Sequence, residues 1–431
     1  MACTRTGIPL RSIPAGDVLV RTAQRVGRLY ISNQFLTCFD VVWQTVGEKY
    51  FDPAFGGLDW NEIHTRYQPQ IAAARDDHTI YELVNKMLFE LNVSHMVVVP
   101  PDTKGQIEPI LSAEGHIGVD LRVLEESAVI TAVEPDSPGE VAGLRPGFRL
   151  QEINGQTIQQ IASEVRLIPP FHDRNKRQLI TSKIKEHVYG IPGTRIRLVY
   201  QDGSGEAHEA EIRLKPRGDK VVLDEMLPPF FIEFELRRLE GDIGYIRFNA
   251  FLPPVYERLV EALADLGDPR ALIIDIRGNH GGVWPVRKLL AEQLVRDPVL
   301  FWRYQSRDAT EEVYLEPVKN AFAGSLVVIV DELSKSSAEE FAGAMQAIHR
   351  AVVVGQGTPG NCVVCDFLKL PNDATLIYPI KQTITAAGTV LEGHGVTPDI
   401  EVALARTQLL QGVDSQLMAA IRHLNSGRAT G

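Results

Sequence analysis

The sequence predicts a multidomain α/β protein in which a helical region, a β-rich domain and an α/β core follow one another. The first observation is length, because 431 residues exceed what one hydrophobic core usually organises. The second is a change of hydrophobic period near residue 106, from helical spacing to strand alternation. The third is a series of short apolar runs after residue 217, which are typical of strands that a sheet buries on both faces.

The N-terminal region, residues 1–105, reads mostly as helix. Residues 41–50 and 79–91 carry apolar side chains at helical spacing, and residues 52–59, which contain proline and two glycines, separate these two helices. We therefore expect a small helical unit ahead of the first β domain.

The second region, residues 106–216, alternates as strands do. Strands are predicted over 119–123, 128–133, 150–153, 194–200 and 210–214. Residues 137–147 predict a short helix that begins with a proline and ends at a glycine. A charged stretch within 160–190 interrupts the pattern, and we interpret it as an insertion.

The third region, residues 217–405, is predicted to be α/β, and residues 406–431 a C-terminal helix and tail. Apolar strands are expected over 271–276, 326–330 and 351–354. Helices are expected over 256–266 and 338–349. Strands that alternate with helices are typical of a parallel sheet covered on its faces.

The composition limits the classes of function. Hydrophobic residues make up 44% of the chain and charged residues 23%, and the net charge is −11, which argues against a broad nucleic-acid surface. No apolar run approaches the ~18 residues of a membrane-spanning helix. Residues 1–20 lack the apolar stretch of a signal peptide, so we expect a cytoplasmic protein unless the chain was trimmed from an exported precursor.

The strongest catalytic signal is a serine where a buried strand passes into a helix. Ser336 stands between the predicted strand 326–330 and the predicted helix 338–349. With Glu339 three residues later, it also has the spacing of a capping box, which requires no catalysis. However, a helix N-terminus supplies unpaired N–H groups and a positive dipole end, and both suit an oxyanion beside a serine nucleophile.

A glycine-rich turn follows the apolar strand 271–276. Residues 278–282 read Gly-Asn-His-Gly-Gly, and glycines allow backbone N–H groups to approach a ligand closely. Alone, this turn indicates only a tight loop. Combined with Ser336, it predicts an oxyanion hole formed by the backbone N–H groups of Gly281, Gly282 and Ser337.

Three blocks in order resemble the signatures of the C-terminal processing, or tail-specific, serine peptidases. They are residues 271–282, the Ser-x-x-Glu helix start at Ser336, and residues 391–400. The resemblance covers nearly all of residues 40–405. The resemblance implies a PDZ-like domain over 106–216 and a core of the crotonase-like type. It also implies hydrolysis of polypeptides and no cofactor. A homo-oligomer is compatible with the resemblance.

The chain departs from the common branch of that family, which pairs its serine with a lysine. Asn361 stands where the lysine belongs, and an amide is not a base. A second branch, that of the tricorn protease core, uses a histidine within a Ser-His motif and a glutamate before the last block. The resemblance therefore implies that Ser336 is the nucleophile and His95 the general base. It further implies Ser94 as a relay and Glu392 as the group that orients the histidine.

Each of these residues also has an ordinary explanation. Ser94 and His95 can end a helix, where a histidine favours the negative end of the dipole, and Glu392 can be a solvated loop acid. Four other side chains are rival bases: His280, His394, Lys335 and Lys381. A non-catalytic binding protein on the same fold, as the interphotoreceptor retinoid-binding proteins are, is the alternative function. Such a relative should have lost the serine, the histidine or the Gly-Gly turn, and this chain keeps all three.

The PDZ-like region implies recognition of a chain end, because such domains capture a peptide carboxylate on the backbone N–H groups of a glycine-containing loop. The predicted peptide-binding residues are Ile117, Gly118 and Val119. Two departures weaken this inference: Gly147-Phe148 replaces the common Gly-Asp, and residues 160–190 are inserted.

The cysteines are not expected to carry a metal or a disulfide framework. Four cysteines are too few for such a framework, and Cys362 and Cys365 lie in a segment that reads as a strand, on opposite faces. No second cysteine pair completes a zinc site. We interpret them as buried or incidental thiols, with a redox or metal role as the alternative.

Overall fold

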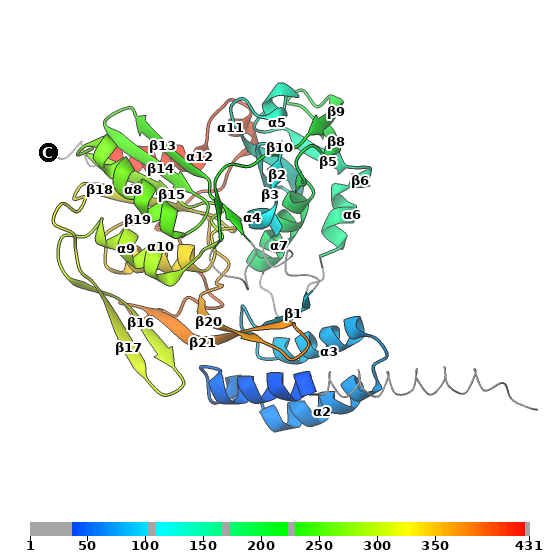
Figure 1. The fold of residues 1–431 in the computed structure, drawn as a ribbon. Coiled ribbons are helices and arrows are strands. Elements are labelled where there is room, and N and C mark those ends of the chain that lie inside the picture. The colour runs from blue at the N-terminus through cyan, green and yellow to red at the C-terminus, as the bar shows by residue number, and fades with distance from the viewer. Residues whose placement is uncertain (1–36, 102–108, 166–172, 223–228, 427–431) are drawn as a thin grey trace, which may run out of the picture.

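The computed structural model describes residues 37–101, 109–165, 173–222 and 229–426. Figure 1 shows three parts along the chain: a helical unit at the bottom, a β domain at the upper right and an α/β core at the left. The predicted absence of a signal peptide concerns residues 1–20, which lie outside the described residues.

The helical unit begins with a helix over residues 37–49 and continues with η1 (Phe55–Gly57), α2 (Trp60–Ala73) and α3 (Asp77–Phe89). Asp59 caps α2, because its carboxylate accepts hydrogen bonds from the N–H groups of Asn61 and Glu62, both at 3.0 Å. The indole N–H groups of Trp43 and Trp60 each donate to the other residue's carbonyl at 3.0 Å. These contacts fix the first helix against α2.

The central domain is built on a six-stranded antiparallel sheet. Five strands follow in the order β3 (Val119–Leu124), β4 (Ser127–Val133), β5 (Arg149–Ile153), β8 (Arg195–Gln201) and β9 (Ala207–Arg213), and the short β6 (Gln156–Thr157) pairs with β5. Shorter elements complete the domain: β2 (Gly115–His116), α5 (Pro138–Val141), α6 (Ile158–Ser163), β7 (Tyr189–Gly190) and β10 (Lys215–Pro216). Within the predicted insertion, α7 (Asp173–Glu186) packs with its buried Ile184 in the core of this domain. The helix predicted over 137–147 is shorter than expected, because Gly143 adopts a left-handed φ of 82° and ends it.

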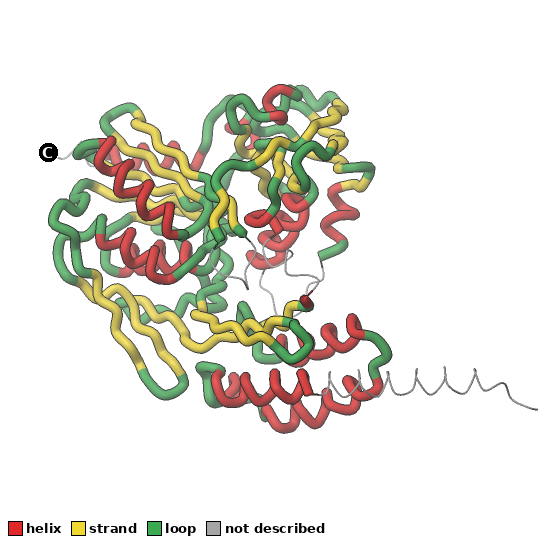
Figure 2. Tube along the Cα trace, viewed as in Figure 1, coloured by secondary structure: helices red, strands yellow, loops and turns green. Residues whose placement is uncertain are grey.

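The α/β core is built on a six-stranded sheet with the order β13 (Phe234–Leu239), β14 (Ile243–Phe248), β15 (Ala271–Asp275), β18 (Ser325–Val330), β19 (Val352–Gly355) and β22 (Ile400–Glu401). All neighbours from β14 to β22 pair in parallel. One face packs on α8 (Pro253–Leu266), α9 (Trp284–Glu292) and α10 (Ser337–Ala347), and the other on α12 (Ser415–Ser426). Figure 2 shows these red helices flanking the yellow strands, which explains why every residue of β15 is buried.

A second sheet joins the core to the helical unit. It contains β1 (Val97–Val99), β16 (Val299–Ser306), β17 (Thr310–Leu315), β20 (Val363–Lys369) and β21 (Thr375–Thr385). The long strand β21 pairs with β1 near its start and with β16 near its end. Leu376 and Tyr378 of β21 belong to the same hydrophobic cluster as the N-terminal helices. The helical unit therefore rests on this sheet.

The remaining described elements are connecting ones: α4 (Pro109–Ser112), β11 (Lys220–Val221), β12 (Phe230–Phe231) and α11 (Arg406–Leu409). What matters for the site is the direction of the parallel strands. The loops after β15, β18 and β19 all leave the carboxyl edge of the sheet, where α/β proteins bind their ligands.

Candidate active site

Ser336 lies at the junction of the loop after β18 with α10. It is the residue immediately before the helix, and its backbone has φ 55° and ψ −123°, a conformation that non-glycine residues rarely adopt. Such strain persists only where the surrounding structure imposes it, and it clusters at functional sites. The local structure therefore presents this serine in the manner expected of a nucleophile.

Asp331 ties the loop before Ser336 to the glycine-rich turn after β15. Its carboxylate accepts hydrogen bonds from the N–H groups of Gly278 at 2.9 Å and Leu333 at 3.0 Å. A second link runs from the N–H of Lys335 to the carbonyl of Asn279 at 3.0 Å. The two turns that carry the predicted site are thus one hydrogen-bonded unit.

The Gly-Gly turn touches Ser336 directly. A Cβ added to Gly281 would lie 2.7 Å from Cβ of Ser336, and one added to Gly282 would lie 2.3 Å from the carbonyl oxygen of Phe251. Both φ angles are positive, 88° and 144°. The N–H of Gly281 donates to Oδ1 of Asn279 at 2.9 Å, so this one of the predicted oxyanion donors is engaged within the turn. Gly282 and Ser337 carry the other two predicted N–H donors.

Ser94, His95 and Glu392 form a hydrogen-bonded group, although nearly three hundred residues separate its ends. The Ser94 hydroxyl is 2.8 Å from Nδ1 of His95 and donates to Oε2 of Glu392 at 3.0 Å. The N–H of Ser94 donates to Oε1 of Glu392 at 2.7 Å. Because the hydroxyl gives its proton to the carboxylate, it accepts one from Nδ1–H, which leaves Nε2 as the unprotonated nitrogen. A general base needs that tautomer.

Burial raises the pKa of Glu392, and hydrogen bonds from Ser94 and from the N–H of Cys362, the latter at 2.7 Å, oppose this rise. A cavity of about 330 Å³ adjoins this carboxylate. Its lining comes from the loop after the first helix, the loop before Ser94 and two strands of the second sheet: Tyr50, Phe51, Asp52, Pro53, Asn92, Val93, Gln305 and Gln382.

Glu339 connects the serine to this group, a role that the capping-box spacing only hinted at. Its fully buried carboxylate accepts hydrogen bonds from the N–H groups of Ser336 at 3.1 Å and Asn361 at 2.8 Å. The next residue, Cys362, donates to Glu392. A continuous series of contacts therefore runs from the backbone of Ser336 to the ring of His95.

The four rival bases lie at different points of the core, and two of them are neighbours of the site along the chain: Lys335 directly precedes Ser336, and His280 directly precedes the Gly-Gly turn. Lys381 forms an ion pair with Glu311 at 2.7 Å, and His394 is exposed, with Nδ1 3.0 Å from the carbonyl oxygen of Glu392. The N–H of His280 donates to the carbonyl of Asn249 at 3.1 Å. Burial raises the pKa of Cys362 and of Cys365 well above the usual thiol range, so neither is a thiolate near neutral pH.

The predicted peptide-binding loop of the central domain is bound to its own domain. The carbonyl of Ile117 accepts from the N–H of Gly139 at 2.8 Å, and Gly118, with φ 75°, has no room for a Cβ beside Ser137. Beside it, Asp120 of β3 accepts from Lys185 of α7 at 2.8 Å. This ion pair joins the strand to the inserted helix.

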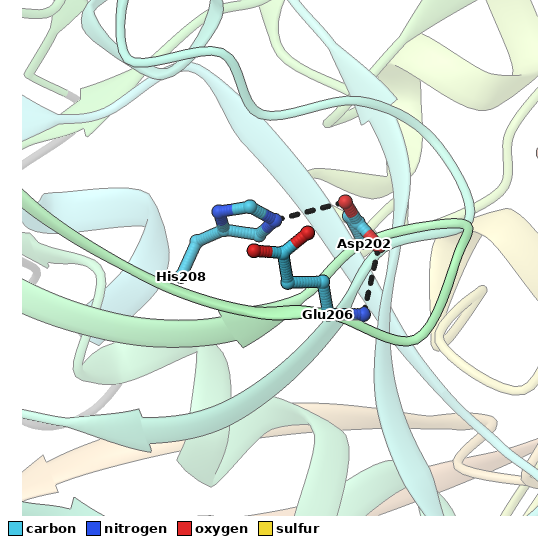
Figure 3. A group of neighbouring side chains, drawn as sticks. All are labelled: Asp202, Glu206 and His208. Atoms are coloured by element: carbon cyan, nitrogen blue, oxygen red, sulfur yellow. Dashed lines mark hydrogen bonds and ion pairs between the residues drawn. The ribbon is translucent and has the colours of Figure 1, made fainter.

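One group of three side chains in the described part of the chain has the spacing of a metal site. Asp202, Glu206 and His208 lie on the hairpin between β8 and β9, with ligand atoms within 4.8 Å of one another (Figure 3). Nε2 of His208 is 2.8 Å from Oδ2 of Asp202, and the N–H of Glu206 donates to Oδ1 at 3.0 Å. These contacts account for the group as a capped hairpin turn, outside the α/β core that holds Ser336.

Comparisons with known proteins match each part of the chain. The model of the Tricorn protease C1 domain matches residues 32–89, that of the PDZ domain residues 129–170, and that of Peptidase family S41 residues 242–402. A carboxyl-terminal-processing protease of Synechocystis is 22% identical over 90% of this chain and 86% of its own length. The carboxyl-terminal-processing peptidase 3 of Arabidopsis thaliana is 22% identical over 89% of this chain and 71% of its own.

Solved structures share the fold. The photosystem II D1 C-terminal processing protease has a TM-score of 0.56 at 17% identity and covers 88% of this chain and 96% of its own. Mature CPAF has a TM-score of 0.60 at 13% identity, with 88% and 94% covered. The predicted fold class, a helical region, a PDZ domain and an α/β peptidase core, is confirmed.

The α/β core places a serine at the start of a helix, and proteolytic relatives match the chain along its length. Together these features define a serine peptidase. The chain carries a core that matches peptidase family S41, preceded by segments that match the tricorn C1 domain and the PDZ domain. Its substrates are polypeptides, and this proteolytic function is favoured over the non-catalytic binding alternative. Among the described helices, none has the length and hydrophobicity to cross a bilayer.

Proposed function

We propose that the chain cleaves polypeptides through an acyl-enzyme on Ser336, with His95 as the general base. The observation that carries the proposal is the Ser94 hydroxyl, which bridges Nδ1 of His95 and the carboxylate of Glu392. This bridge supplies the tautomer in which Nε2 accepts a proton. Asn361, at the position of the lysine of other relatives, has no basic side chain, so the base must come from elsewhere.

The chemistry follows the general logic of a serine nucleophile activated by an oriented histidine. Nε2 of His95 takes the proton of the Ser336 hydroxyl as Oγ bonds to the carbonyl carbon of the substrate. The N–H groups of Gly282 and Ser337 stabilise the oxyanion. The imidazolium then gives its proton to the departing amine, and water, activated by the same imidazole, hydrolyses the acyl-enzyme.

The Ser94 hydroxyl and Glu392 stabilise the imidazolium in this scheme. Nδ1–H donates to Oγ of Ser94, and that hydroxyl donates to the carboxylate. The positive charge on the ring is thereby coupled to a half-buried negative charge through one hydroxyl. Glu392 thus orients the base without touching it.

We further propose that the substrates are cut near their C-termini or in unstructured segments. Relatives of this chain are named as carboxyl-terminal-processing proteases, and PDZ domains capture chain ends. A pair of peptides that differ only in a free or an amidated C-terminus measures this preference. A faster cleavage of the free acid supports the proposal, and equal rates contradict the C-terminal part of it.

The catalytic assignment is tested with Ser336→Ala, His95→Ala and, as a matched control, His394→Ala. The first two variants should lower kcat on a casein-derived fluorogenic peptide by at least about a thousandfold, the scale seen when a member of a catalytic triad is removed. Labelling by a fluorophosphonate probe should disappear in Ser336→Ala and slow strongly in His95→Ala. His394→Ala should retain both the peptide cleavage and the probe labelling of the wild type. Wild-type turnover in either of the first two variants would contradict the assignment.

A further inference from the structure

The residue after the proposed nucleophile has a completely buried side chain with two partners. The hydroxyl of Ser337 donates to the carbonyl oxygen of Gly282 at 2.9 Å and accepts from Nη1 of Arg287 at 2.8 Å. A guanidinium has donors only, so the hydroxyl must accept from it and direct its own proton to Gly282. The direction of this hydrogen bond is therefore fixed.

An ion pair inside the core holds the arginine. Nη2 of Arg287 lies 2.6 Å from the carboxylate of Glu340, and each side chain is only 3% exposed. Nη2 also donates to the hydroxyl of Tyr304 at 2.6 Å, and the hydroxyl of Thr383 donates to Glu340. Breaking a buried pair leaves an uncompensated charge, so such a network resists displacement.

The carbonyl of Gly282, which accepts the hydrogen bond from Ser337, belongs to the turn that faces the nucleophile. On the other side of that turn, the N–H of Phe251 donates to the carbonyl of Gly281 at 2.7 Å, and the N–H of Val283 donates to the carbonyl of Phe251 at 2.9 Å. Gly281 and Gly282 are thus held from both sides. Ser337, which donates the hydrogen bond to Gly282, is the first residue of α10, the helix that begins beside the nucleophile.

The far end of the network reaches β21, the strand that also supports the base. Thr383 lies opposite Tyr304 in the pairing of β21 with β16. Near its start, β21 pairs with β1, which begins two residues after His95. One strand therefore carries the histidine segment at one end and the support of the Gly-Gly turn at the other.

We propose that Ser337 is a positioning residue: its hydroxyl, oriented by the Arg287–Glu340 ion pair, sets the Gly281–Gly282 turn at the distance from Ser336 that the oxyanion requires. The inference rests on the proposed function, because it assumes that the turn faces the reacting carbonyl. The sequence pattern pointed only to the backbone N–H of Ser337, and nothing in it indicates a role for the hydroxyl.

The test compares kcat, KM and the inhibition constant of a peptide aldehyde, whose tetrahedral adduct places an oxyanion in the site. Removing an oxyanion donor costs about 10²–10³ in kcat, and a displaced donor should cost less. Ser337→Ala should therefore lower kcat about tenfold or more and weaken the aldehyde by a similar factor. The KM and the urea midpoint of unfolding should change little.

A second pair of variants acts at the other end of the network, away from the reacting atoms. Thr383→Val removes the hydroxyl that donates to Glu340 and keeps the shape, and Thr383→Ser keeps the hydroxyl. Thr385→Val is the matched control, because Thr385 is equally buried on the same strand but its hydroxyl accepts from the N–H of Thr389. We expect a loss of kcat in Thr383→Val, its recovery in Thr383→Ser, and no loss in Thr385→Val.

The outcomes separate the two proposals. Activity in Ser336→Ala would overturn the proposed function itself. With Ser336→Ala inactive, a folded Ser337→Ala that keeps the wild-type kcat and aldehyde affinity would overturn the positioning role alone. Should Ser337→Ala fail to fold, Thr383→Val decides: a kcat equal to that of Thr385→Val overturns the inference, and a kcat that falls with the aldehyde affinity supports it.

Discussion

At the scale of single residues, Glu339 is held in place by an unusual number of hydrogen bonds. Four donors converge on its carboxylate: the N–H groups of Ser336, Gly360 and Asn361 and the hydroxyl of Thr358. Burial raises the pKa of Glu339 to about 7, although these hydrogen bonds oppose the rise. The carboxyl group therefore changes its charge near neutral pH while it holds the backbone of the proposed nucleophile.

This raised pKa predicts a loss of stability with rising pH. Between the ordinary value of 4.5 and about 7, the folded protein binds a proton at Glu339 that the unfolded chain releases. The stabilisation is fully present below the unfolded pKa and is lost as the pH rises through the folded pKa. Relative to Glu339→Gln, the wild type should lose on the order of 3 kcal/mol of unfolding free energy between pH 4.5 and pH 7.

Urea denaturation of both proteins across that range measures the difference. The same substitution at the exposed Glu257 is the control, and it should leave the pH dependence of the wild type intact. We compare the unfolding free energy of the wild type with that of Glu339→Gln. If the difference stays constant or grows as the pH rises, the four hydrogen bonds outweigh the effect of burial on the pKa of Glu339.

At the scale of elements, the Gly-Gly turn and the start of α10 are built against each other. A Cβ on Gly281 would lie 2.7 Å from Cβ of Ser336 and 2.9 Å from the carbonyl oxygen of Lys335. Real Cβ atoms do not approach other atoms so closely, so the turn or the helix start would have to move. Glycine is required here for close approach as well as for its φ of 88°.

Gly281→Ala should therefore inactivate the enzyme, because the added Cβ would displace the Gly-Gly turn or the start of α10. A misplacement of about 1 Å can cost about a hundredfold in rate, and we expect at least that loss in kcat. Gly155→Ala is the matched control, since Gly155 has a similar φ of 82° but no atom within 4 Å of an added Cβ. The control should lose roughly 1–2 kcal/mol of stability through backbone strain and keep its kcat. Equal kcat values for the two variants would contradict the argument.

At the scale of the whole molecule, the PDZ domain is tied to the loop that carries Ser336. Nε of Arg122, on β3, donates to Asp331 at 2.6 Å, and these side chains are 3% and 1% exposed. A second attachment comes from the segment after the core, where Leu410 packs so closely on Gly147 that an added Cβ would lie 2.6 Å from its Cγ. That contact accounts for the glycine at 147, because any larger residue there would displace Leu410.

Arg122→Met should consequently impair a site in another domain. It leaves Asp331 buried without its cation, and a broken buried pair costs about 3–5 kcal/mol. Asp331 also orders Gly278 and Leu333, so the rate of fluorophosphonate labelling should fall as well. Arg197→Met, which breaks the exposed pair with Glu209, is the control and should cost at most about 1 kcal/mol. Stability and labelling rates equal to those of the control would argue that the two domains are independent.

Much of the local structure follows from the sequence because its causes are local. The apolar run predicted over 271–276 is β15, Ala271–Asp275, and the strand and helix predicted around Ser336 are β18 and α10. The hydrophobic period, the helix caps and the glycines of turns act within a few residues, so they can be recognised without knowledge of the fold. Of the second sheet, the strand expected around Cys362 and Cys365 is β20. The strands β16 and β21 escaped prediction, because they carry mixed polar and apolar residues whose faces are set by what packs on them.

The sequence by itself determined the family, the order of the parts and the chemical types at the site: a serine at a helix start, a Gly-Gly turn, a Ser-His pair and a glutamate. Only the tertiary structure decided that Ser94 bridges His95 and Glu392, and that Glu339 and Asp331 join the separate turns. The physical reason is that these contacts link residues far apart along the chain. A hydrogen bond has no local signature in either partner, and it forms only because the sheets bring the two backbones together.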